Sequence, residues 1–121
     1  MKEAFLQIIN GECTSISILL FLVKCMSSEY PPDIRMSAST KLVISIKKLS
    51  ETKKGIIRDA LFTRLTITKD TWEQRNIVEV LASCIEKPLK QKLLSILQNP
   101  HIDGSVRKRG QSLLLKEKPD G

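Results

Sequence analysis

The sequence predicts an all-α protein, a right-handed α-solenoid of about three helical hairpins preceded by a short N-terminal helix. Apolar residues recur every three or four positions along most of the 121-residue chain, the spacing of one helix face. Turns of a few residues separate these stretches, so neighbouring helices are expected to be antiparallel. A similar motif opens three of the helices at intervals of 40 and 32 residues, which is typical of stacked helical hairpins.

The N-terminal part is predicted to hold the short helix, over residues 1–10, and the first helix of the first hairpin, over residues 16–27. Gly11 follows the short helix and is a common C-terminal stop. Residues 16–23 are almost continuously apolar, which also fits a strand, but nothing else in the chain resembles a strand that could pair with them. The run is too short to span a membrane.

The second helix of the first hairpin is predicted to begin in the stretch YPPDIR at residues 30–35. The two prolines fix the backbone and disfavour helix before them. The carboxylate of Asp33 is expected to accept hydrogen bonds from the free amides at the helix start. Apolar residues then follow at helical spacing as far as Leu49.

The remaining helices follow the same pattern. Residues 50–52 are a cap region before a helix over 54–66, and Asp70 with Glu73 resembles a capping box. Pro88 suits the first turn of the next helix, and the last helix restarts near Asp103. The hairpins are therefore expected at about 16–49, 53–86 and 88–116. They form a single domain over 1–117, followed by a flexible tail at 118–121.

The motif that repeats is an arginine with a small or β-branched residue three positions later and an apolar residue seven positions later. It occurs at Arg35, Arg75 and Arg107, and an acidic residue precedes the first and last of these, Asp33 and Asp103. A single hairpin cannot bury its apolar face alone, whereas stacked hairpins share a continuous core.

This motif resembles the HEAT repeat, an armadillo-type α-solenoid whose second helix opens with Asp-x-Val-Arg. The resemblance covers residues 16–115 and makes the fold a HEAT-like helical-repeat domain. It implies that the arginines bind a neighbouring repeat's Asp and helix-end carbonyls, and so hold adjacent hairpins in register. The structural repeat residues are then Asp33, Arg35, Arg75, Asp103 and Arg107.

Residues 33–42, 57–61 and 75–82 are also similar to the N-terminal region of the importin-β (karyopherin) family, which has these helices in the same order. That resemblance implies a role in nuclear transport, with a Ran-type GTPase or cargo as partner. The chain would then be the N-terminal arm of a transport receptor.

The net charge of +7 points to an acidic partner. Between residues 87 and 118, eight lysines and arginines face two acidic residues. We expect a non-enzymatic protein-interaction module or scaffold that binds along its concave face; the alternative is a basic nucleic-acid-binding domain. The candidate binding residues are Lys41, Lys47, Lys48, Lys108 and Arg109, although exposed lysines of this kind also serve simply to keep a surface soluble.

No residue pattern points to catalysis, a metal or another cofactor. The three cysteines show no CxxC spacing, and His101, the single histidine, has no nucleophile near it in sequence and is expected to face solvent in a turn. The odd cysteine count favours a reducing compartment, so a cytoplasmic or nuclear location is expected. Apolar end faces of a short array also make self-association an open alternative.

Overall fold

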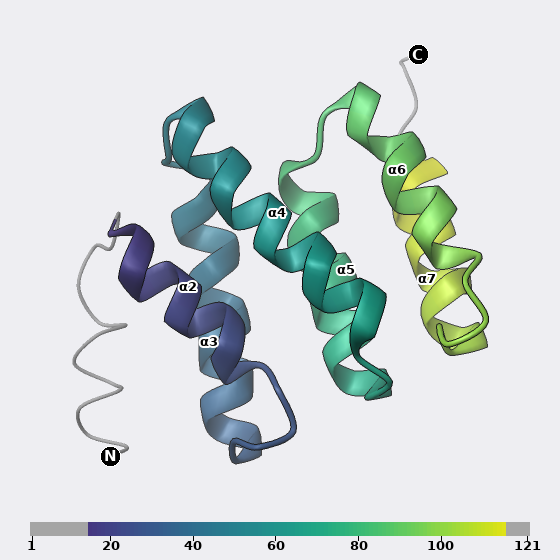
Figure 1. Cartoon of the computed structure of the whole chain (residues 1–121), viewed down its shortest axis with the longest axis horizontal. Coiled ribbons are helices and arrows are strands. Elements are labelled where there is room, and N and C mark those ends of the chain that lie inside the picture. The colour runs from purple at the N-terminus through teal and green to yellow at the C-terminus, as the bar shows by residue number, and fades with distance from the viewer. Residues whose placement is uncertain (1–14, 116–121) are drawn as a thin grey trace. The chain divides into compact units, whose positions relative to one another are not determined.

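The computed structural model describes residues 15–115, and in that part of the chain it contains helices and no strand (Figure 1). The prediction of an all-α chain is confirmed for these residues. The short helix expected over 1–10 and the tail at 118–121 lie outside them. The helices are α2 (Ile16–Cys25), α3 (Pro32–Ile46), α4 (Glu51–Ile67), α5 (Thr71–Cys84), α6 (Lys87–Leu97) and α7 (Gly104–Leu115).

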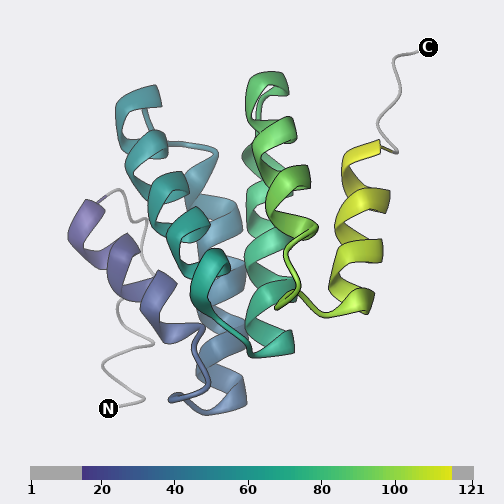
Figure 2. The ribbon, with the colours of Figure 1, turned by 45° about the vertical axis from the view of Figure 1, so that its right-hand side comes forward.

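The chain forms two compact units, Met1–Leu61 and Phe62–Gly121, which divide within α4. In the first unit, α2 and α3 pack as a hairpin joined by a short turn (Figures 1 and 2). The core of this unit consists of side chains with no exposed surface, among them Leu19, Leu22, Leu42, Ile46 and Ile57. Burial of such aliphatic side chains is the main favourable contribution to its stability.

Local chemistry fixes where the helices of the first unit begin. Pro31 is extended and Pro32 is the first residue of α3, where its missing N–H costs no hydrogen bond. Asp33 Oδ1 accepts a hydrogen bond from the Ile34 amide at 2.9 Å, as expected for a carboxylate at a helix start. Helix α4 begins earlier than predicted because the Ser50 hydroxyl accepts from the Lys53 amide at 3.3 Å and caps it.

In the second unit, α7 packs against both α5 and α6, and α6 and α7 form a hairpin (Figure 2). Gly110 permits this close approach: a Cβ atom there would lie 2.6 Å from Leu97 Cδ1 and 3.2 Å from Val78 Cγ1. Such contacts would force the neighbouring side chains to shift. The small residue of the repeat motif is therefore required by packing in this copy.

The predicted cap of α5 is half right. Asp70 Oδ1 accepts from the Glu73 amide at 3.2 Å, as expected. The Glu73 carboxylate, however, accepts from the Thr68 hydroxyl at 2.7 Å and from Arg64 Nε at 2.6 Å instead of the Asp70 amide. Thr68 Oγ1 accepts from that amide at 3.2 Å. A threonine before the cap thus takes the place of the capping-box glutamate.

None of the helices in residues 15–115 combines the length and the apolar character that crossing a membrane requires.

Candidate functional site

Arg35 and Arg107 each form hydrogen bonds across the turn of their own hairpin. Arg35 Nε donates to the Met26 carbonyl at 3.1 Å. Arg107 Nε donates to the Leu97 carbonyl at 2.7 Å, and its Nη2 donates to Asn99 and Ile102 carbonyls at 3.3 and 3.2 Å. Carbonyls at a helix end have no partner within the helix, so the guanidinium groups satisfy them.

The expected bonds to helix-end carbonyls are present, but those of Arg107 stay within the α6–α7 hairpin, so the expectation that Arg107 holds adjacent hairpins in register is wrong. Arg35 binds the Met26 carbonyl directly after α2, and Arg107 binds the carbonyl of the last residue of α6 and two carbonyls of the turn that follows. A long side chain one turn into the second helix reaches back over the turn to the end of the first helix. Whether Arg35 also contacts a neighbouring hairpin stays a prediction.

The prediction for Arg75 is wrong, because Gln74 occupies the equivalent position. The first backbone bond of each second helix joins Arg35 to Pro31, Gln74 to Asp70 and Arg107 to Asp103, four residues apart in every case. Arg75 is exposed, and it forms no hydrogen bond or ion pair with the other described residues. Counting four residues from the capping aspartate would have found Gln74 in the sequence.

Gln74 has no exposed surface and joins two turns of the second unit. Its Nε2 donates to the Thr68 carbonyl at 3.0 Å and to the His101 carbonyl at 2.9 Å. Its Oε1 accepts from the Asp103 amide at 3.0 Å. One amide side chain therefore connects the α4–α5 turn to the α6–α7 turn.

His101 and Asp103 also have structural roles. His101 is half-buried, and its Nε2 lies 2.9 Å from the Leu65 carbonyl, to which it donates, so the prediction of a solvent-facing histidine is wrong. Asp103 Oδ1 accepts from the hydroxyl of Ser105 at 2.7 Å and from its amide at 2.9 Å. The Ser105 hydroxyl and then the amide lower the pKa of Asp103, because both stabilise the carboxylate.

The five predicted binding residues are divided between the two units. Lys41 lies on α3, and Lys47 and Lys48 are exposed in the turn after it. Lys108 and Arg109 are exposed on α7. Whether all five share one face remains a prediction.

Three cations of the C-terminal part of the second unit are engaged within it. Arg109 Nε lies 2.9 Å from Glu79 Oε2 on α5, and Arg107 binds three carbonyls. Lys92 Nζ lies 4.5 Å from the centre of the Phe62 ring, a cation–π contact. The first unit contains a second concentration of charge, since six lysines and arginines between Lys41 and Arg58 face one acid, Glu51.

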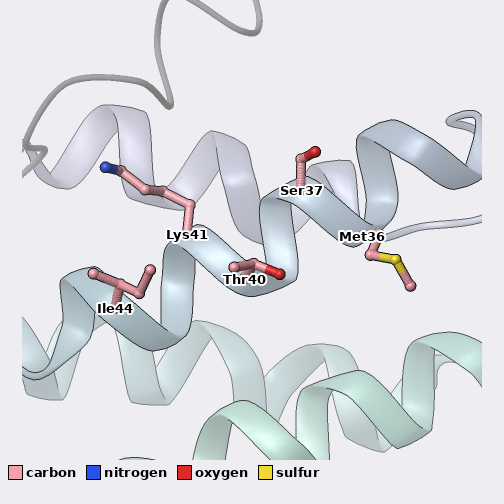
Figure 3. A pocket seen from close by; sticks show the side chains of 5 residues that line it. All are labelled: Met36, Ser37, Thr40, Lys41 and Ile44. Atoms are coloured by element: carbon pink, nitrogen blue, oxygen red, sulfur yellow. The ribbon is translucent and has the colours of Figure 1, made fainter.

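Among the described residues of the first unit, the two most exposed large apolar side chains lie on α3. Met36 and Ile44 are 60% and 50% exposed. Together with Ser37, Thr40 and Lys41 they line an open hollow of about 280 Å³, here called the α3 face (Figure 3). Figure 3 shows Thr40 between Met36 and Ile44, with Ser37 and Lys41 extending along one side. Met36 and Ile44 lie about two turns apart on one side of α3 with Thr40 between them, so they form one stripe on the helix.

Within residues 15–115, no three His, Cys, Asp or Glu side chains are grouped so that they could hold a metal ion. Burial raises the pKa of the Cys25 thiol to about 11, with Lys24 opposing the shift, so this thiol stays protonated near neutral pH. Cys25 has no exposed surface and behaves as a small apolar core residue.

Comparison with models of protein families, with curated proteins and with solved structures finds no match to this chain.

Proposed function

We propose that the chain is a HEAT-like α-solenoid that acts as a non-enzymatic protein–protein interaction module or scaffold. The observation that carries the proposal is the α3 face, where Met36 and Ile44 stay 60% and 50% exposed on an ordered helix. Exposed apolar side chains that are aligned on one element and bordered by charge are typical of a protein-binding surface.

The helical hairpins support the same proposal. The second helices α3 and α7 carry equivalent arginines that bind the end of the preceding helix, as expected for repeated units. In a stack of such units the second helices line the concave surface, where α3 would meet a partner. A narrower form, an N-terminal arm of a karyopherin-like receptor that binds a Ran-type GTPase or cargo, rests on the motif resemblance alone.

A nucleic-acid-binding domain has less support. Its main candidates were cations of the C-terminal third, and Arg107 and Arg109 are engaged with carbonyls and with Glu79. The binding of a phosphate backbone is strengthened by cations, whereas Met36 and Ile44 add little to it.

The test is affinity capture from extract of the source organism with nuclease present, using the wild-type chain, a Met36→Ser/Ile44→Ser variant and an Ile56→Ser control. Ile56 is 44% exposed on α4 and is not among the residues that line the α3 face, so it controls for the loss of one exposed apolar side chain. We expect a partner that the control retains, the double variant loses, and the purified wild-type chain binds by calorimetry. Capture of identical proteins by all three chains would overturn the proposal.

A further inference from the structure

We draw no further inference here: the strongest candidate, the exposed apolar stripe of Met36 and Ile44 on α3, belongs to the site already described, and nothing in the structure shows what covers it.

Discussion

Helices α3 and α7 match on their inward sides and differ on their outward sides. When they are aligned on Arg35 and Arg107, the small residues Ala38 and Gly110 coincide, as do the buried leucines Leu42 and Leu114. The outward positions diverge: exposed Met36 of α3 corresponds to exposed Lys108 of α7.

The difference separates packing from recognition. Inward residues must fill the space against the preceding helix. Both helices therefore have side chains of similar size at these positions. Outward residues meet no such requirement, and an apolar pair there costs solubility unless a partner covers it. The α3 face is therefore where a function specific to this chain is expected, and α7 is the internal reference for it.

The first prediction tests how α5 fits this comparison. Gln74→Leu should lower the free energy of unfolding of the second unit by about 3 kcal/mol, because two carbonyls and one amide lose a buried partner. Urea denaturation followed by fluorescence of Trp72, the only tryptophan, reports on this unit.

Arg75→Ala is the matched control, one residue further along α5. Since Arg75 is exposed, the change should stay within about 0.5 kcal/mol. An effect of Arg75→Ala as large as that of Gln74→Leu would restore Arg75 as the repeat residue and shift the alignment of the hairpins by one position.

The second prediction tests the inward match at the small residue. Gly110→Ala should destabilise the chain by about 1–2 kcal/mol, because the added Cβ would lie 2.6 Å from Leu97 Cδ1 in a filled core. Gly55→Ala, in α4 with nothing within 4 Å of the added atom, should stabilise by up to about 1 kcal/mol. Thermal unfolding followed by circular dichroism compares the two. Equal changes would mean that helix propensity, and not the contact with Leu97, decides the outcome.

The third prediction has the smallest effect and concerns the residues that end α2 and α6. Cys25 and Leu97 each end the first helix of a hairpin and have no exposed surface. In a Cys13→Ser chain at pH 8, Cys25 should react with a thiol reagent at least about tenfold more slowly than half-buried Cys84. Mass spectrometry of the labelled peptides measures both rates.

The raised pKa of Cys25 also gives a pH dependence. The folded chain holds the neutral thiol, because burial raises its pKa from the ordinary value of 9.0 to about 11. Its contribution to stability is therefore complete below pH 9 and is lost as the pH rises through about 11. Cys25→Ala should remove the part of the alkaline loss of stability that this thiol causes. An unchanged alkaline profile in this variant, or rapid labelling of Cys25, would contradict its placement as a core residue.

Local sequence signals predicted the helices well, because prolines and capping side chains act within a few residues of themselves. Pro32, Pro88 and Asp70 all stand at the helix starts where they were expected. The stripe of Ile57, Leu61 and Leu65 is fully buried, as its spacing predicted.

Partners across the turns were harder to predict. Glu73 was assigned to Asp70 and binds Arg64 and Thr68 instead. His101 was assigned to solvent and donates to the Leu65 carbonyl, 36 residues away. Such hydrogen-bond partners depend on which chain segments meet in space, and the spacing of apolar residues along a helix does not specify this.

The candidate binding surface was found in part. Lys41 was predicted from the position of a charge on α3, but Met36 and Ile44 were not, since a lone methionine in a helix is usually a core residue. Their exposure depends on which side of α3 packs against α2, and this orientation is a property of the packed hairpin.

The bridge formed by Gln74 limits how freely the hairpins can be rearranged. An arginine at this position of a second helix binds carbonyls of the turn in its own hairpin. Such a hairpin therefore keeps these hydrogen bonds when it is moved to another place in a chain. A hairpin with glutamine there depends on the next one for the His101 carbonyl and the Asp103 amide. The segment from α4 to α7 is thus inherited or exchanged most safely as one block. The residue four positions after the cap, arginine or glutamine, therefore indicates whether a hairpin can be moved alone or only together with the next one.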